Sequence, residues 1–377
     1  MKLHNNRVLV GMSGGVDSSV AAALLVEQGY DVIGITIKTY RYEDVGGNVG
    51  NDSTCCSLDG INDARRIAQQ LGIPHYVVDF SEVFKKNVID YFVRDYLDGN
   101  TPNPCVQCNK TIKWGEMDRK ADSLGAQWIA TGHYANIRRD EITGRYILSR
   151  DEHNPKDQTY ALWAVSQDSL ARTMFPLSGF SKNRSREEAS RLGLGIASKP
   201  ESYEICFIPD NDYNRFLRDM VPDLEEKVAD GAIMLDGKQI GTHHGYPFYT
   251  VGQRRGLGIA HSEPLYVLNV LPDQNIVEVG TDEKLLHQGL IADNVNLIKY
   301  GDITEKREFT VKIRYKDEGA PASCYIDKDQ KLHIEFYEPR KAITPGQSVV
   351  MYEGNDVVGG GIITQWTDIP SFTSFGL

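Results

Sequence analysis

A short stretch near the start of the chain combines glycines, hydroxyls and one carboxylate in a pattern suited to binding phosphate. It directly follows the apolar run Val8–Val10 and precedes a helical pattern, so it reads as a turn between a strand and a helix. Adjacent glycines let a ligand approach bare backbone, and the uncapped amides of a helix start attract anions. The residues of this loop are Gly11, Met12, Ser13, Gly14, Gly15, Val16, Asp17 and Ser18.

This loop lacks the Gly-Lys-Ser/Thr ending whose lysine reaches the β and γ phosphates in a Walker loop. The run Ser13–Ser19 instead resembles the signature of the ATP pyrophosphatase superfamily, whose members release pyrophosphate and attach AMP to a substrate oxygen. The resemblance therefore implies ATP as a cofactor. Asp17 is a candidate ligand for a Mg²⁺ ion beside the departing pyrophosphate.

Two cysteines follow a proline-rich loop in the segment Thr101–Lys110. Two prolines hold the loop extended, and the apolar spacing predicts a helix that begins near Asn109. Cys108 would then lie at a helix N-terminus, with Lys110 nearby, and both features favour a thiolate. The spacing of Cys105 and Cys108 is equally consistent with a zinc site or with thiols that only fill space.

Cys206 lies in a different setting, between apolar neighbours in the run Ile205–Ile208. Such neighbours are typical of a buried and inert cysteine, and nothing in the local sequence suggests that the thiol is activated. The chain has six cysteines in 377 residues, too few for a disulfide framework. Their use is better explained by thiol chemistry or metal binding in a reducing compartment.

Alternating strand and helix patterns must position these groups. We expect strands at Val8–Met12, Val32–Ile37, His75–Phe80 and Trp128–His133, and helices at Ser18–Gln28, Leu58–Leu71 and Ser81–Leu97. A capping box at Ser185–Glu188 marks a further helix. The alternation predicts an α/β domain with a doubly wound parallel sheet, in which ligands bind beyond the carboxyl ends of the strands.

The rest of the chain favours β structure. Glycine-rich sequence with short apolar runs covers Gly231–Gly280, and alternation from Phe309 to Tyr315 marks half-buried strands, with a hairpin turn at Glu353–Asp356. We expect a catalytic domain over residues 1–212, a small β-rich domain over 213–284 and an antiparallel β-barrel over 285–377.

Composition limits the function classes. The net charge of −11 argues against a generally basic nucleic-acid binder, so an RNA site must be a local patch. The start of the chain does not resemble a signal peptide, and no apolar run approaches the length of a membrane span. The expected location is cytoplasmic, without a membrane partner.

Several ordered motifs together resemble one family over nearly the whole chain, the bacterial tRNA-specific 2-thiouridylases. They are Ser13–Ser19, Thr101–Lys110, Thr131–Tyr134, Lys156–Gln158, Glu204–Ile208, Tyr249–Gly258 and Lys312–Tyr315. The resemblance implies an ATP pyrophosphatase fold and a tRNA-uridine 2-sulfurtransferase. ATP adenylates the C2 oxygen of the wobble uridine, and persulfide sulfur then replaces it, giving 2-thiouridine, AMP and pyrophosphate.

The resemblance also assigns roles to residues. Cys206 corresponds to the persulfide carrier, and Cys108 to the thiol that frees the sulfur and closes a disulfide with Cys206. The ATP site corresponds to Gly11–Ser18, Ile37 and Gly132. The tRNA and target-base residues correspond to Asn103, Pro104, Cys105, His133, Lys156, Asp157, Gln158, Arg314, Tyr315 and Gln347. The implied partners are a tRNA with a wobble uridine, a persulfide donor (a cysteine desulfurase or a relay protein) and a thiol reductant.

Three departures from the family pattern stand out. Cys105 occupies a position that is an aspartate in some members, so Cys105, Cys108 and Cys206 form a candidate set for an iron-sulfur cluster or another metal. Ile37 replaces a frequent methionine. The pair Cys55 and Cys56 lies outside the motifs, and the glycine-rich loop Glu43–Ser53 is either a lid or a tolerated insertion.

Two other functions stay open. One is another ATP pyrophosphatase, a synthetase that adenylates a small carboxylate, and it would not need Cys108 or Cys206. The other is a non-catalytic tRNA-binding protein whose thiols hold a metal. Loss of thiolation in Cys108→Ser and in Cys206→Ser separates the sulfurtransferase from the synthetase. Formation of AMP and pyrophosphate by metal-free protein in a tRNA-dependent way would exclude the non-catalytic binding protein.

Overall fold

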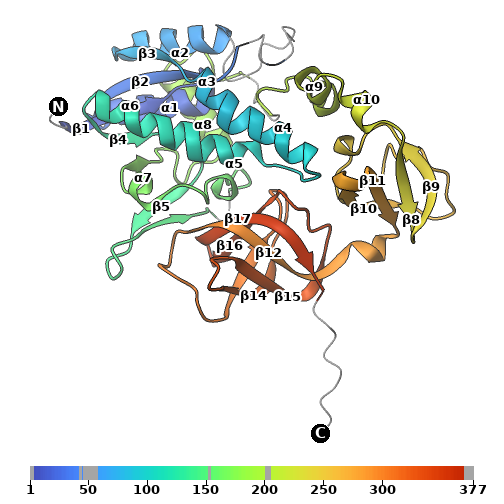
Figure 1. Ribbon diagram of the computed structural model, residues 1–377. Helices are drawn as coiled ribbons and strands as arrows, with labels where there is room; N and C mark the ends of the chain where they lie inside the picture. The colour runs from blue at the N-terminus through green and yellow to red at the C-terminus, as the bar shows by residue number, and fades with distance from the viewer. Residues whose placement is uncertain (1–3, 42–44, 46–57, 152–153, 200–204, 369–377) are drawn as a thin grey trace. The chain divides into compact units, whose positions relative to one another are not determined.

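The N-terminal part of the chain forms a parallel sheet in the computed structural model (Figure 1), which describes residues 4–41, 45, 58–151, 154–199 and 205–368. The strand order is β3-β2-β1-β4-β7, and all neighbours are parallel. The strands are β1 (His4–Gly11), β2 (Asp31–Lys38), β3 (His75–Asp79), β4 (Ala126–Ala130) and β7 (Thr173–Met174). The predicted parallel sheet is confirmed, with the ends of the four predicted strands shifted by a few residues. The sequence pattern does not predict the short edge strand β7.

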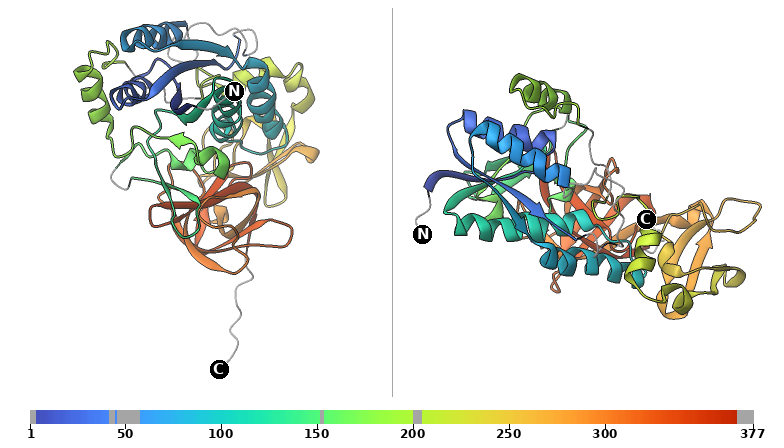
Figure 2. Two further views of the ribbon diagram at one scale, coloured as in Figure 1. Left: turned by 90° about the vertical axis from the view of Figure 1, so that its left-hand side faces the viewer. Right: turned by 90° about the horizontal axis from the view of Figure 1, so that it is seen from above.

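Helices cover both faces of this sheet. Figure 2 shows α1 (Val16–Glu27) and α2 (Leu58–Leu71) on one face and α6 (Met117–Ser123) on the other. Helix α1 packs against α8 (Lys182–Arg191) and is buried along most of its length, so its apolar residues form the centre of the core with the strands. The arrangement is the doubly wound architecture that the sequence predicts.

Two long helical segments contain π-helical turns. The first runs through α3 (Ser81–Phe84), η2 (Lys85–Ile89) and α4 (Asp90–Leu97), as the sequence predicts. The second runs through α5 (Pro104–Cys108), η3 (Asn109–Glu116) and α6. The predicted start of that helix near Asn109 is wrong, because Pro104 occupies its first position, where a fixed φ and a missing N–H cost nothing.

The start of α8 also differs from the prediction. Ser181, rather than Ser185, caps the helix, and its hydroxyl accepts a hydrogen bond from the Arg184 amide at 3.2 Å. Ser185 is buried one turn inside the helix, where its hydroxyl contacts that of Tyr134. Both serines match the sequence pattern of a cap, and burial of Ser185 decides between them.

The chain divides into two compact units by its contacts. Unit 1 comprises residues 1–90, 104–220 and 355–357, and unit 2 comprises residues 91–103, 221–354 and 358–377. Unit 1 further contains β5 (Asn136–Arg139), β6 (Tyr146–Ser149), η4 (Thr159–Ala161), α7 (Gln167–Leu170) and α9 (Tyr213–Met220). Within the described residues, no helix has the length and apolar character needed to cross a membrane.

Unit 2 contains a small four-stranded sheet of order β10-β11-β8-β9. Strands β8 and β11 pair in parallel, and the other neighbours are antiparallel. The elements of this part are α10 (Leu224–Val228), β8 (Gly231–Leu235), β9 (Lys238–His243), η5 (Tyr246–Phe248), β10 (Tyr266–Leu271), η6 (Pro272–Gln274), β11 (Ile276–Gly280) and η7 (Asp282–Leu285).

Six further strands of unit 2 close into a barrel, as expected. Their order is β12-β15-β14-β13-β16-β17, and β12 also pairs with β17. The strands are β12 (Leu286–Leu297), β13 (Arg307–Lys312), β14 (Ala320–Ile326), β15 (Leu332–Lys341), β16 (Ser348–Glu353) and β17 (Asp356–Thr367). The alternation predicted through Tyr315 ends early, because the Ile313 amide donates to the Asp317 carboxylate at 3.0 Å instead of to a strand.

Candidate active site

The loop after β1 has a backbone that only glycine accommodates. Gly14 has a φ of +71°, and a Cβ at this position would lie 2.1 Å from the carbonyl oxygen of Gly60 in α2. The Ser18 hydroxyl accepts a hydrogen bond from the Ser13 amide at 3.1 Å and so holds the turn closed. Helix α1 then begins at Val16, and the N-cap residue Gly15 has no side chain to cap it. Such a start offers its first amides to an anion.

Gly132 and Ile37 lie at the same edge of the sheet as this loop. Ile37 is half-buried near the end of β2, and Gly132 follows β4, so both flank the end of β1. A Cβ on Gly132 would lie 2.6 Å from the Ser18 amide nitrogen, which shows how closely the two segments approach. The residues predicted for the ATP site are therefore at the carboxyl edge of the sheet, where doubly wound folds bind ligands.

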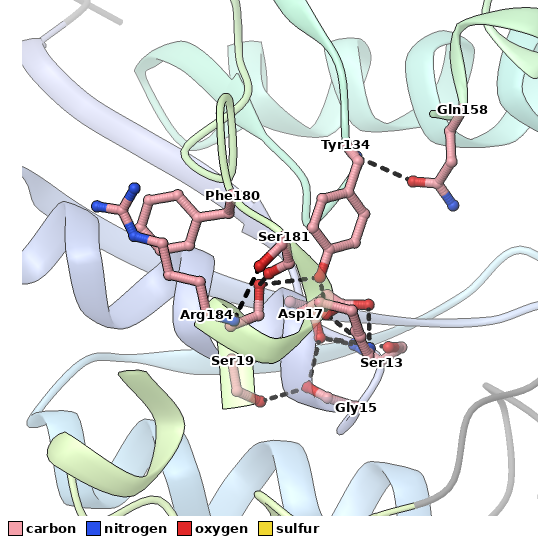
Figure 3. Close-up of polar contacts among 12 residues, drawn as sticks. Ser13, Gly15, Asp17, Ser19, Tyr134, Gln158, Phe180, Ser181 and Arg184 are labelled. Atoms are coloured by element: carbon pink, nitrogen blue, oxygen red, sulfur yellow. Dashed lines mark hydrogen bonds and ion pairs between the residues drawn. The ribbon is translucent and has the colours of Figure 1, made fainter. Parts of the chain in front are cut away.

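Asp17, which belongs to this loop, contacts two side chains from elsewhere in the fold. Its carboxylate oxygens each accept a hydrogen bond from the Lys182 ammonium group at 2.8 Å. One of them also accepts from the Tyr134 hydroxyl at 2.6 Å (Figure 3). Both oxygens therefore already accept hydrogen bonds from the protein, and the ammonium group neutralises the charge that would attract a magnesium ion. The arrangement does not fit Asp17 as a magnesium ligand, and the carboxylate instead joins α1 to α8.

A second lysine, Lys199, contacts the loop after β1 from a distant part of the sequence. The Lys199 ammonium donates to the Gly14 carbonyl oxygen at 3.1 Å and forms an ion pair with Asp63 of α2 at 2.6 Å. Lys199 also lines a cavity of about 670 Å³ beside α2. Neither Lys182 nor Lys199 could be predicted from the sequence as part of this site, since no local motif marks them. The only signal was the missing lysine of the loop itself.

The candidate catalytic cysteines lie on two segments of unit 1. Cys105 is exposed and Cys108 is half-buried, both within α5, so the thiol nearest the helix N-terminus is that of Cys105 and not that of Cys108. Cys206 is half-buried between the half-buried Ile205 and the buried Phe207, and its carbonyl oxygen accepts a hydrogen bond from the Tyr40 hydroxyl at 2.7 Å. Phe207 is buried and packs against Phe84.

Within the described part of the chain, no three His, Cys, Asp or Glu side chains form a group that could hold a metal ion. Cys105, Cys108 and Cys206 all belong to that part, so their arrangement does not fit a three-thiol cluster. Cys324, in contrast, is fully buried in the barrel, where burial raises its thiol pKa far above the ordinary value. Cys55, Cys56 and all of Glu43–Ser53 except Val45 lie outside the described residues.

The predicted tRNA residues of unit 1 are largely engaged with the protein. His133 is buried, and its ring nitrogens contact the Thr131 hydroxyl at 2.7 Å and the Lys113 ammonium at 3.4 Å. Burial, together with the charge of Lys113, lowers the pKa of His133 well below its ordinary value. The ring is thus held neutral inside the domain.

Hydrogen bonds to Tyr134 and to nearby residues of the same turn hold the segment 156–158 in place. Gln158 exchanges two with the main chain of Tyr134, at 3.0 and 3.2 Å. The Asp157 carboxylate accepts from the amide and hydroxyl of Thr159, while the half-buried Lys156 donates its amide to Asn154. These contacts shape the turn and leave the prediction of tRNA contact untested.

The remaining predicted residues belong to unit 2, except Pro104, which is buried at the start of α5 in unit 1. Arg314 and Tyr315 are exposed in the turn after β13. The Gln347 side-chain amide donates to the carbonyl oxygens of Thr101 and Pro102, at 2.9 and 3.3 Å. Gln347 therefore holds the segment that leads to the half-buried Asn103.

Comparison with known proteins relates the whole chain to one group of proteins. Family models described as the tRNA methyl transferase HUP domain, its PRC-barrel domain and an aminomethyltransferase β-barrel domain match residues 6–210, 214–281 and 287–363. The chain is 52% identical to the tRNA-specific 2-thiouridylase MnmA of Salinibacter ruber, covering 95% of this chain and 94% of that one. It is 50% identical to the MnmA of Amoebophilus asiaticus, covering 99% of both.

A solved structure with a more distant likeness is a 4-thiouridine synthetase in complex with RNA and ATP. It is 19% identical, has a TM-score of 0.34, and covers 58% of this chain and 51% of its own.

Proposed function

Because this chain belongs to the family of tRNA-specific 2-thiouridylases, we propose that it replaces the C2 oxygen of the wobble uridine of tRNA by sulfur, at the expense of ATP. Family membership makes the protein an enzyme, a tRNA-uridine sulfurtransferase. The single observation that supports ATP use is the Gly14 loop, which ends in an uncapped helix start at the carboxyl edge of the parallel sheet. The proposal includes the division of the chain into a catalytic domain over residues 1–212, a small β-rich domain over 213–284 and a β-barrel over 285–377.

The first step joins the C2 oxygen of the uridine, which is a poor leaving group, to AMP, which is a good one. The O2 atom of the uridine attacks the α-phosphorus of ATP, the bond to the β-phosphate oxygen breaks, and pyrophosphate leaves with that electron pair. Amides of the loop Ser13–Ser18 stabilise the charge that develops on the phosphates. Magnesium enters this proposal as a partner of the ATP phosphates. No protein carboxylate is assigned to hold it.

The second step uses two thiols. A persulfide donor, a cysteine desulfurase or a relay protein, first loads a sulfur atom onto Cys206. The terminal sulfur attacks C2 of the uridine, and AMP leaves. The Cys108 thiolate then attacks the Cys206 sulfur, which closes a Cys108–Cys206 disulfide and leaves the second sulfur on the base. A thiol reductant supplies the two electrons that reopen the disulfide.

Mass spectrometry of the nucleosides of a wobble-uridine tRNA, incubated with enzyme, ATP, persulfide donor and reductant, tests the proposal. We expect 2-thiouridine with wild-type protein and none with Cys108→Ser or Cys206→Ser. Cys324→Ala is the matched control, because its thiol is buried in the barrel and has no role in the reaction. Undiminished 2-thiouridine from Cys206→Ser would refute the persulfide assignment. Absence of tRNA-dependent AMP with wild type would favour a non-catalytic tRNA-binding protein.

A further inference from the structure

The loop Ser13–Ser18 contains no lysine or arginine, yet it is built to hold a phosphate chain. Backbone amides alone stabilise a highly charged anion less than amides together with a mobile ammonium group, which is why many phosphate loops include a lysine. The structure brings two lysines to this loop from elsewhere. Lys182 donates to both carboxylate oxygens of Asp17, whereas Lys199 contacts the backbone of the loop itself, at the Gly14 carbonyl.

Lys199 stands between the loop and an open space. Its side chain is 28% exposed, and it lines the 670 Å³ cavity together with Ser198 and residues of α2. Asp63 on α2 accepts from Lys199 and also pairs with Arg66. One carboxylate therefore pairs with two cations beside a loop that contains no positive side chain of its own.

We propose that Lys199 is a phosphate-binding residue of the ATP site, whose ammonium group leaves Asp63 and contacts the pyrophosphate portion of ATP on the Gly14 loop. The exchange needs little movement, because Lys199 already touches the loop at the Gly14 carbonyl and lines an open cavity in which its side chain has room to turn. A phosphate chain with several charges competes well with one carboxylate for the ammonium group. In the absence of nucleotide, Asp63 keeps Lys199 in place.

This inference rests on the proposed use of ATP, and direct binding of pyrophosphate separates the two. Isothermal titration calorimetry measures the affinity for magnesium pyrophosphate and, separately, for magnesium ATP. The affinities of wild type, Lys199→Gln and Lys199→Arg are compared. Glutamine keeps a donor for the Gly14 carbonyl but removes the charge. The matched control is Lys85→Gln, since Lys85 also pairs with a carboxylate, Asp90, at 2.7 Å on the same unit.

We expect Lys199→Gln to bind pyrophosphate about 10-fold to 100-fold more weakly than wild type, the range for one charge-assisted hydrogen bond. Lys199→Arg retains most of the affinity, and Lys85→Gln matches wild type. Equal pyrophosphate and ATP affinity of Lys199→Gln and wild type would overturn the assignment of Lys199 while leaving ATP use intact. If wild type binds neither ligand, ATP use itself fails. Urea denaturation of each variant checks that it is folded.

Discussion

Asp17 shows how a residue that suits one role can be committed to another. A carboxylate in a phosphate loop suggests a metal ligand, but this one is held by Lys182 and by the Tyr134 hydroxyl, which in turn contacts Ser185 of α8. The ion pair is largely shielded, with side-chain exposures of 14% for Lys182 and 31% for Asp17. It fixes the start of α1, from which the loop amides project.

Removing Lys182 should therefore destabilise the fold. In Lys182→Met, the Asp17 charge remains in a poorly solvated position without its cation, and we expect a loss of about 1–3 kcal/mol in the free energy of unfolding. Asp17→Asn combined with Lys182→Met should recover part of that loss. Urea denaturation measures both. Lys38→Met is the control, because the Lys38–Asp79 pair is far more exposed and should cost about 1 kcal/mol or less. Equal losses at the two sites would contradict this view.

His133 makes stability depend on pH. Because its pKa in the folded protein lies well below the ordinary value of 6.5, the unfolded chain takes up a proton at a pH where the folded protein does not. Stability is therefore lost as pH falls below about 6.5, by up to about 1.4 kcal/mol per pH unit for this one group.

His133→Asn keeps a polar atom near Thr131 but removes the titration. We expect the variant to lose less stability than wild type between about pH 7 and pH 5.5, measured by urea denaturation. The control is His261→Asn, which changes an exposed histidine and should keep the wild-type slope. Parallel pH profiles for wild type and His133→Asn would show that the buried ring does take up a proton.

At the scale of elements, periodicity and glycine stops were sufficient to predict the parallel sheet and most of its helices. The errors are at helix starts. Pro104 suits both an extended loop and a first helical position, and the choice depends on packing that the sequence does not show. Ser181 and Ser185 compete in the same way for the cap of α8, and burial of Ser185 against Tyr134 decides. Lys182 and Lys199 could not be predicted as neighbours of the loop, because tertiary folding alone brings them there.

The turn between β15 and β16 contacts Thr101, in the segment that precedes α5. Gly346 has a φ of +89°, and a Cβ there would lie 2.8 Å from the backbone of Thr101. We expect Gly346→Ala to lower the free energy of unfolding by about 2–4 kcal/mol, since a backbone clash adds to the cost of a left-handed conformation. Hydrogen exchange of the Thr101 amide, which donates to the Pro345 carbonyl oxygen, should become faster.

Gly354 provides the matched control for this glycine. It also has a positive φ, of +57°, but a Cβ there would meet open space. Gly354→Ala should therefore cost only about 1 kcal/mol, the price of the backbone conformation alone. If both variants lose the same stability and exchange Thr101 equally fast, the contact between Gly346 and Thr101 has no supporting role.

At the scale of the whole molecule, an acidic protein must bind an acidic polymer. The net charge of −11 repels RNA at long range, so binding depends on a few cations placed where phosphates come close. Arg314 and Tyr315, exposed together in the turn after β13, are the clearest such pair in unit 2, since one offers charge and the other a stacking face. The segments 91–103, 221–354 and 358–377 all belong to that unit, so the chain enters it three times.

The salt dependence of tRNA affinity distinguishes local from bulk charge. Arg314→Ala and Lys284→Ala each remove one positive charge from unit 2, and Lys284 is an exposed lysine paired with Asp236 on the small sheet. If Arg314 contacts a phosphate, tRNA binding by Arg314→Ala releases one counterion fewer than binding by wild type. The magnitude of the slope of log affinity against log salt then falls by about 0.7–0.9. Lys284→Ala should leave the slope unchanged. Fluorescence anisotropy with labelled tRNA over a salt series measures both slopes. Equal slopes for the two variants would mean that net charge, and not the position of Arg314, governs this contribution to binding.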